Sequence, residues 1–409
     1  MNCRHCGATL QLPFLDLGSA PPSNAYLTKE SLQAPELWFP LRVLVCEQCW
    51  LVQTEDFSRA DALFSADYAY FSSFSDTWLQ HARDYVQTMI NRFTLNANSK
   101  VIEIAANDGY LLQYVQQAGI PCLGIEPTAG TAQAARAKGL TIIEDFFGEQ
   151  LAHTLAADGQ CADLMTANNV LAHVPDINDF ARGFTTLLKP QGVATFEFPH
   201  LLRLVRENQF DTVYHEHYSY LSLTTVKTIF SSQGLHIFDV EQLPTHGGSL
   251  RVFAQRADLG EHERTKRVTE VLAEEMAAGM AATAFYTGLQ GRTEQVKNDL
   301  LTFLLTTKQQ GLTVAAYGAA AKGNTLLNFA GVRPDLLPYV VDRNPVKQGK
   351  FMPGSRIPIV DEAHLQRHRP NRVLILPWNL DDEVMKQLDY IREWGGQFVT
   401  AIPQLRVIP

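Results

Sequence analysis

The hydrophobic positions of the chain alternate between short apolar runs and stretches with helical spacing. Short runs predict strands over residues 100–104, 122–126, 140–147, 162–170 and 192–199. Helical spacing begins at residue 77, where apolar side chains recur three and four positions apart, and returns between the strands. Strands that alternate with helices indicate a mainly parallel sheet, with a ligand crevice at the carboxyl ends of its strands.

The same alternation returns in the last third of the chain. Strands are predicted over residues 312–317, 339–342, 372–377 and 397–403. Two helices, over residues 261–278 and 294–308, precede them and are expected to pack as connectors. We therefore predict a second α/β unit, with a crevice of its own.

Four of the six cysteines form two pairs, Cys3 with Cys6 and Cys46 with Cys49. Two such pairs in a short segment can surround a tetrahedral zinc ion with four thiolates. A redox pair or four incidental cysteines are the weaker interpretations. Because four thiols leave no coordination position open, the predicted zinc is structural.

Composition and charge narrow the class of protein. The 409 residues are 46% hydrophobic and 19% charged, which is typical of two or three folded domains. A net charge of -9 argues against nucleic acid as a partner. No apolar run reaches the roughly 18 residues of a membrane span, and the first residues lack the apolar core of a signal peptide. We expect a cytoplasmic protein that contacts no membrane.

Three domains follow from these patterns. Residues 1–75 are predicted to form a zinc-binding domain with a connector, residues 76–260 a cofactor-binding α/β domain, and residues 261–409 a helical linker with a second α/β domain. The connector contains the aromatic run at residues 64–73, which either covers a ligand or packs as a linker. Tyr68 is the candidate site residue in that run.

Two cofactors compete for the central crevice. The turn after the first strand reads Ala-Ala-Asn-Asp-Gly and lacks the Gly-x-Gly-x-x-Gly of NAD-binding proteins. An acid in the first strand, a small-residue turn and an acid that ends the second strand are typical of S-adenosylmethionine sites. The candidate cofactor residues are Glu103, Asn107, Gly109, Glu126, Asp145, Phe146 and Asn168.

Residues 214–220 read Tyr-His-Glu-His-Tyr-Ser-Tyr, an unusual density of acid and base groups. Such a run is costly to bury unless its donors and acceptors are paired. We interpret it as a site of proton transfer. A metal site at His215, Glu216 and His217 is the alternative, but adjacent residues rarely converge on one ion.

The turn after the strand at 312–317 contains a lysine among small residues. Backbone amides and one ammonium at such a turn can hold a pyrophosphate. The spacing differs from that of a P-loop, so hydrolysis of ATP is not indicated. The candidate residues for binding a phosphorylated substrate are Lys322, Asn324, Asp342, Lys347 and Lys350.

Together these motifs resemble the bacterial C-methyltransferases of nucleotide-linked keto sugars, such as those of tetronitrose biosynthesis. The similarity is carried by the cysteine pairs, the turn at 103–109, Asn169 with His173, residues 214–222 and His246-Gly-Gly-Ser-Leu-Arg251. It implies an N-terminal zinc domain, a class I methyltransferase domain and a C-terminal Rossmann-like domain. It also implies that the first crevice holds S-adenosylmethionine and the second helps to hold a sugar linked to thymidine or guanosine diphosphate.

The resemblance implies a reaction as well. A carbon next to a ketone, expected to be C-3 of a 4-keto deoxysugar, loses a proton and accepts the methyl group. His217 is the expected base because imidazole titrates near neutral pH, Tyr214 the donor to the enolate oxygen, and Glu216 a partner in proton transfer. Asn169 and His173 are expected to line the site, while His215 has no assigned role.

Other functions remain open at this stage. An O- or N-methyltransferase is the nearest alternative, since it shares the cofactor and needs no base for a carbon acid. A zinc-ribbon interaction protein without enzymatic activity is a more distant one. The protein is expected to be a monomer or a homodimer.

Overall fold

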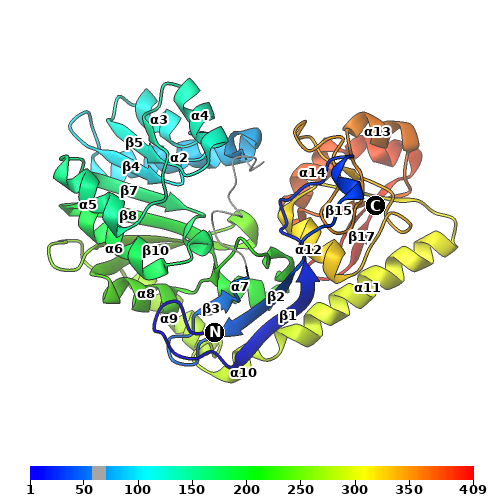
Figure 1. Cartoon of the computed structure of the whole chain (residues 1–409), viewed down its shortest axis with the longest axis horizontal. Helices are drawn as coiled ribbons and strands as arrows, with labels where there is room; N and C mark the ends of the chain where they lie inside the picture. The colour runs from blue at the N-terminus through cyan, green and yellow to red at the C-terminus, as the bar shows by residue number, and fades with distance from the viewer. Residues whose placement is uncertain (58–70) are drawn as a thin grey trace.

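The described part of the protein is built around three β-sheets. The structure is a computed structural model, and it describes residues 1–57 and 71–409. Figure 1 shows the central domain and the C-terminal domain as two lobes, with strands of the N-terminal domain at the base between them. Tyr68 lies outside the described residues.

The N-terminal sheet takes one of its four strands from the central part of the chain. Its order is β1-β2-β3-β9, and all of its neighbouring strands are antiparallel. The strands are β1 (Leu12–Ala20), β2 (Phe39–Val45), β3 (Val52–Thr54) and β9 (Ser219–Tyr220). Strand β2 leads directly into Cys46. Because β9 follows the Tyr-His-Glu-His run directly, the sheet of the zinc domain fixes the backbone next to that run.

The central sheet has seven strands in the order β10-β11-β8-β7-β4-β5-β6. Its strands are β4 (Val101–Ile104), β5 (Cys122–Ile125), β6 (Ile142–Ile143), β7 (Ala162–Asn168), β8 (Leu188–Pro199), β10 (Leu235–Leu243) and β11 (Ser249–Arg256). Strands β8, β7, β4, β5 and β6 are parallel to one another. Strand β11 is antiparallel to its neighbours β8 and β10. The strand order reverses between β4 and β7, where a ligand crevice is expected.

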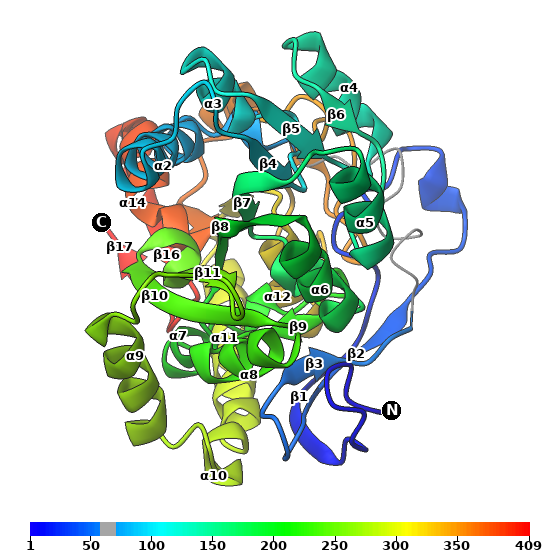
Figure 2. The ribbon, with the colours of Figure 1, turned by 90° about the vertical axis from the view of Figure 1, so that its left-hand side faces the viewer.

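Helices cover both faces of the central sheet (Figure 2). They are α2 (Asp76–Phe93), α3 (Leu112–Gln117), α4 (Ala129–Ala137), α5 (Glu149–Ala157), α6 (Ile177–Leu187) and α8 (Leu223–Ser232). The helix α7 (Leu201–Arg206) packs instead in the apolar core of the N-terminal sheet. In α2, Ser75 accepts a hydrogen bond from the backbone of Trp78 and caps the helix, and the apolar positions at helical spacing are buried. Among the described residues, no helix combines the length and the apolar character needed to cross a bilayer.

The C-terminal domain repeats the α/β plan. Five parallel strands lie in the order β14-β13-β12-β15-β16, and β17 closes one edge in the antiparallel direction. The strands are β12 (Val314–Tyr317), β13 (Val340–Val341), β14 (Ile359–Val360), β15 (Arg372–Ile375), β16 (Gln397–Thr400) and β17 (Arg406–Ile408). The helices are α12 (Ala321–Phe329), α13 (Glu362–His368) and α14 (Asp381–Gln387). The reversal of strand order here lies between β12 and β15.

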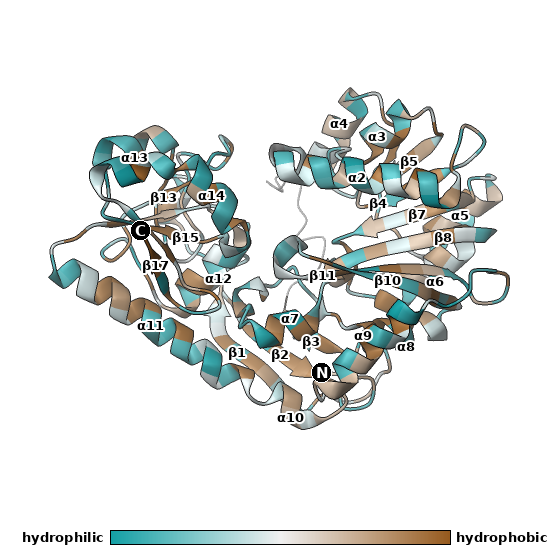
Figure 3. Ribbon diagram, turned by 180° about the vertical axis from the view of Figure 1, so that it is seen from behind, coloured by the Kyte–Doolittle hydropathy of each residue, from teal (hydrophilic) through white to brown (hydrophobic). Residues whose placement is uncertain are grey.

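Three helices connect the central and C-terminal domains: α9 (Lys266–Ala277), α10 (Thr283–Tyr286) and α11 (Leu289–Gln309). One apolar core runs from the N-terminal sheet through α10 and α11 into the C-terminal sheet. Phe14, Tyr286, Leu300 and Leu374 are all buried in it. The hydropathy colouring shows these strands as largely apolar, while polar residues are frequent on the helices (Figure 3). The N-terminal and C-terminal domains are therefore packed against each other.

A buried carboxylate joins α9 to the start of α8. Glu275 is fully buried and accepts hydrogen bonds from the backbone nitrogens of Leu223 (2.7 Å) and Thr224 (2.8 Å) and from Nε2 of His200 (2.8 Å). It thus satisfies the unpaired amides at the N-terminus of α8 from a different helix.

We expect Glu275→Gln to lower the free energy of unfolding by about 1–3 kcal/mol, because an amide replaces a charged acceptor of buried donors. Glu274→Gln is the matched control: Glu274 itself makes a partly exposed ion pair with Arg206, and its loss should change stability by less than about 1 kcal/mol. Denaturant unfolding of the three proteins measures the difference. Equal stabilities for both variants would contradict the expectation.

Candidate active site

A cavity of about 1070 Å³ lies where the carboxyl ends of the two α/β sheets face each other. The central domain contributes the loops that follow β4, β5, β6 and β7, and the C-terminal domain contributes the loops that follow β12 and β15. Asn24 and Asp56 add a wall from the N-terminal domain. The crevices expected separately for the two α/β units are thus parts of one cavity.

Glu126 organises the cavity floor at the end of β5. Its carboxylate accepts hydrogen bonds from the backbone nitrogens of Asn107 (2.9 Å) and Thr128 (3.0 Å) and from the hydroxyl of Thr131 (3.0 Å). It lines the cavity together with Asn107, whose side-chain oxygen accepts from the backbone of Ser72. The turn after β4 and the end of β5 are thereby joined through one acid.

Glu103 lies beneath this floor, fully buried in β4. Burial, with the nearby charge of Glu126 as a smaller cause, raises the pKa of Glu103 well above its usual value. Its Oε2 has no hydrogen-bond partner among the described residues. A buried oxygen without a partner is costly, although Glu103 itself is not among the residues that line the cavity.

The other predicted cofactor residues divide into two groups. Asp145, Phe146 and Asn168 line the cavity, and Oδ1 of Asn168 has no partner in the described part of the chain. Packing, rather than contact with a ligand, explains the glycine at position 109: its φ is +76°, and a Cβ there would lie 2.3 Å from a side-chain atom of Leu140. A side chain at that position would clash with Leu140, which follows α4.

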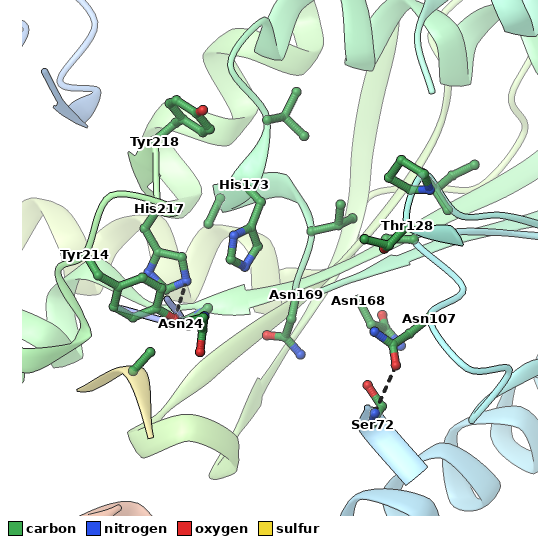
Figure 4. Close-up of a pocket in the computed structure, with 18 of the residues that line it drawn as sticks. Asn24, Ser72, Asn107, Thr128, Asn168, Asn169, His173, Tyr214, His217 and Tyr218 are labelled. Carbon is green, nitrogen blue, oxygen red and sulfur yellow. Dashed lines mark hydrogen bonds between the residues drawn. The ribbon is translucent and has the colours of Figure 1, made fainter. Parts of the chain in front are cut away.

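The hydrogen bonds around His217 determine which of its ring nitrogens carries the proton. Its Nδ1 donates to the carbonyl oxygen of Thr212 (2.9 Å), so in the neutral ring Nε2 carries the lone pair. That Nε2 accepts a hydrogen bond from the hydroxyl of Tyr214 at 2.8 Å, which Figure 4 marks with a dashed line between the two side chains. Both side chains line the cavity. The pair presents a base and a hydroxyl side by side.

Burial keeps this imidazole uncharged. It lowers the pKa of His217 well below the usual value, and the neighbouring His173 lowers it further. Burial also lowers the pKa of His173 to about 4. The two rings are in edge-on contact, with centroids 4.6 Å apart, and Nδ1 of His173 donates to the carbonyl of Glu216 (2.8 Å). His217 is therefore neutral, and able to accept a proton, at physiological pH.

Asn169 projects into the cavity between the His217 pair and the cofactor residues (Figure 4). Neither its side-chain oxygen nor its nitrogen has a partner among the described residues. Its φ of +56° is a left-handed conformation that costs energy in most residues but is tolerated by asparagine. An unpaired amide held in this conformation is suited to contact a ligand.

Glu216 and His215 are not among the residues that line the cavity. Glu216 accepts from the amide of Asn24 (3.3 Å), and burial raises its pKa to about 7. His215 donates to the carbonyl of Pro40 (3.2 Å) and packs edge-on against Phe39. The catalytic role predicted for Glu216 stays a prediction, whereas His215 makes its contacts with the N-terminal domain.

The loop that carries these residues is also held by the C-terminal domain. Nε1 of Trp378 donates to the buried carboxylate of Asp211 (2.8 Å), and the hydroxyl of Thr325 donates to the carbonyl of Val213 (2.8 Å). Both acceptors lie within a few residues of Tyr214. Movement of the C-terminal domain would therefore displace the site.

Only two of the five residues predicted to bind phosphate, Lys322 and Lys347, line the cavity. Nζ of Lys322 donates to the side-chain oxygen of Asn379 (2.6 Å), and Nζ of Lys347 to the carbonyl of Ala319 (2.8 Å). Asp342 accepts from the backbone of Ala319 and shapes the turn. Asn324 donates to the carbonyl of Ser23, and Lys350, like Asn324 and Asp342, is not part of the cavity wall.

The four paired cysteines form one cluster in the N-terminal domain. Their sulfurs all lie within 4.8 Å of one another, with Cys3 and Cys49 at 3.5 Å and Cys6 and Cys46 at 3.5 Å. A tetrahedral zinc with bonds of about 2.3 Å requires sulfurs about 3.8 Å apart. The donor set and its spacing fit a structural zinc ion.

Comparison with known proteins agrees with this architecture. Family models match along the chain: a zinc binding domain over residues 3–64, a methyltransferase domain over 78–240 and a C-methyltransferase C-terminal domain over 244–403. The chain is 36% identical over 407 residues to the C-methyltransferase NovU of Streptomyces niveus, covering 100% of this chain and 96% of that protein. The chain belongs to this family of C-methyltransferases.

More distant similarities cover only part of the chain. A ubiquinone biosynthesis O-methyltransferase of Actinobacillus pleuropneumoniae is 32% identical over 123 residues, 28% of this chain and 50% of that protein. The magnesium protoporphyrin IX methyltransferase of Synechocystis PCC 6803 with bound SAM matches 44% of this chain and 79% of its own at 16% identity, with a TM-score of 0.34.

The predicted fold class and cofactors are confirmed: a zinc-binding domain precedes a class I methyltransferase domain, and S-adenosylmethionine is the cofactor. The unpaired oxygens of Asn168 and Asn169, which line the cavity, fit a ligand that carries ammonium and hydroxyl donors, as this cofactor does. When bound, it supplies an electrophilic methyl group.

Several cavity residues of this C-methyltransferase were not found from the sequence. His246, Trp78, Asn24 and Asn379 line the cavity. Asn379 follows the strand predicted at 372–377, so its position at a carboxyl strand end was a usable signal. His246 belongs to a motif that carried the resemblance but had no assigned role. Asn24 had no local signal, because only tertiary packing brings it to the site.

We expect Cys46→Ser to reduce bound zinc from one ion per chain to well below one, because the buried thiol at position 46 is lost from the set of four. Elemental analysis of the purified protein measures it. Cys161→Ser, which removes a cysteine outside the cluster, is the control and should keep its zinc. Full zinc content in Cys46→Ser would contradict this ligand set.

Proposed function

We propose that the protein methylates the carbon next to the ketone of a nucleotide-linked 4-keto deoxysugar, at C-3, in the biosynthesis of a branched-chain sugar. The observation that carries this proposal is the neutral His217, whose Nε2 lies 2.8 Å from the hydroxyl of Tyr214 inside the shared cavity. A base beside a hydrogen-bond donor matches a carbon acid and its neighbouring carbonyl oxygen.

The chemistry requires both groups. Carbon becomes a nucleophile when the proton next to a ketone is removed, and the negative charge then develops on the ketone oxygen. With Nδ1 bonded to Thr212, His217 accepts that proton at Nε2. The hydroxyl of Tyr214 turns from Nε2 to the ketone oxygen, which frees the lone pair and stabilises the enolate in one movement. The enolate carbon would then accept the methyl group that S-adenosylmethionine supplies when bound.

The second crevice supports a substrate that bears a diphosphate. The first turn of α12 faces the cavity at Ala320 and Ala321, and no described side chain caps this helix. Its free amides, with the ammonium of Lys322 beside them, form a setting for phosphate oxygens. A nucleotide held there through its diphosphate, linked to thymidine or guanosine, places its sugar toward His217.

Incubation with S-adenosylmethionine carrying a ¹³C methyl group and a panel of nucleotide-linked sugars tests the proposal. We expect a mass gain of one methyl group with 4-keto sugars and none with the matching 4-hydroxy sugars. Carbon-proton correlation spectra then locate the methyl group on C-3. A methyl group on oxygen or nitrogen would overturn the proposal.

We expect His217→Asn to abolish methyl transfer, a loss of roughly 10²–10⁴-fold or more, because it removes the general base. The same variant should lose the exchange of the substrate's reacting proton with deuterium from solvent, measured by NMR without the cofactor. His153→Asn, at an exposed histidine of α5, is the control. Normal exchange in His217→Asn would remove His217 as the base.

The depressed pKa of His217 gives a pH dependence. The base works in its neutral form, and its folded pKa lies well below the usual value, so kcat/KM should hold through about pH 6.5 and fall only at clearly lower pH. Glu216 also titrates, near pH 7, so the profile is measured in Glu216→Gln as well. An acid limb centred at or above pH 6.5 in Glu216→Gln would contradict the assignment.

A further inference from the structure

Arg4 lies inside the first cysteine pair but is not directed at the metal. Its side chain is only 6% exposed although it belongs to a loop near the N-terminus. The guanidinium enters the seam between the zinc domain and the loops of the active site. Arginine is rarely buried without partners, so its contacts indicate what it does.

Those contacts join three parts of the cavity wall. Nη2 donates to the carbonyl of Thr54 (2.8 Å) and to the carboxylate of Asp56 (2.7 Å), and Nη1 donates to the carbonyl of Pro175 (3.2 Å). The guanidinium also lies 5.1 Å from the ring centroid of Tyr218. Asp56, Pro175 and Tyr218 all line the cavity. One planar cation therefore holds three wall segments that are distant in sequence.

The same contacts reach the backbone of His217. The hydroxyl of Thr54 donates to the carbonyl of His217 (2.6 Å), and the backbone nitrogen of Thr54 donates to the carbonyl of Tyr218 (3.1 Å). Gln53 accepts from the backbone nitrogen of Arg4 (2.9 Å) and donates to Sγ of Cys3 (3.3 Å). A short series of hydrogen bonds thus leads from a zinc ligand to the peptide group of His217.

We propose that the zinc knuckle positions the catalytic base, and that Arg4 is the positioning residue that does so. Arg4 acts on His217 through Thr54 and on the cavity wall through Pro175 and Tyr218. The proposal rests on the proposed function, in which His217 removes the proton. It gives the zinc-binding domain a part in catalysis beyond its own folding.

The guanidinium is needed for its geometry. Five donors in one plane reach acceptors in different directions, whereas a lysine ammonium has three donors on one atom. Misplacement of a catalytic group by about 1 Å can cost roughly 10²-fold in rate. A variant that leaves the zinc ligands intact but loosens the seam should therefore lose turnover without losing its fold.

The test uses Arg4→Met, which keeps the length of the side chain and removes its donors. We expect kcat to fall roughly 10–100-fold, while the zinc content and the affinity for S-adenosylmethionine, measured by calorimetry, stay within about twofold. Arg4→Lys should be intermediate. Arg264→Met, at an exposed arginine outside the seam, is the matched control and should behave as the unchanged protein.

A second measurement separates positioning from a general structural role. NMR of ¹⁵N-labelled histidines reports the tautomer and the pKa of His217 without turnover. In Arg4→Met, a looser wall admits water, so the pKa of His217 should rise toward its usual value and the acid limb of kcat should move to higher pH. Arg264→Met should show neither shift.

Two outcomes would overturn the proposal. Unchanged kcat and an unchanged pKa of His217 in Arg4→Met would show that the seam does not position the base. Loss of zinc or of cofactor binding together with kcat would show local unfolding instead. Failure of the proposed function is distinguishable, because it appears as normal proton exchange in His217→Asn, whereas the histidine spectra of Arg4→Met do not depend on the reaction.

Discussion

The hydrogen bond from Nδ1 of His217 to the carbonyl of Thr212 is the constraint on which the site depends. It sets the tautomer, and so places the lone pair at Nε2, next to the hydroxyl of Tyr214. The bond holds only if both ends of the segment 212–217 are fixed. Burial of the ring, which keeps it neutral, depends on the same close packing.

All three domains contribute to holding that segment. Strand β3 of the N-terminal sheet pairs with β9 just after His217, and the hydroxyl of Thr54 donates to the carbonyl of His217. The C-terminal domain holds the preceding residues through Trp378 and Thr325. The central domain supplies His173 against the imidazole ring. One apolar core links the N-terminal and C-terminal parts. The cavity therefore depends on the packing of the domains against one another.

Some of the buried polar groups without partners lie where this packing leaves a space. Glu103, Asn168 and Asn169 each carry an unpaired buried atom among the described residues, and all three lie at or beneath the carboxyl ends of β4 and β7. Glu275, by contrast, is buried with several donors. The cost of the unpaired groups is offset when a ligand with its own donors binds.

The sequence by itself determined the elements, the zinc ligands and the order of the domains, because strand and helix periodicity and cysteine spacing are local signals. It also indicated Glu126 and His217, since acids at strand ends and runs of titratable groups are visible without a fold. The tertiary structure decided the partner of each side chain: His215 bonds to Pro40, Asn324 to Ser23, and Arg4 to Pro175 in the cavity wall. These directions depend on contacts between residues far apart in the chain, for which no local pattern exists.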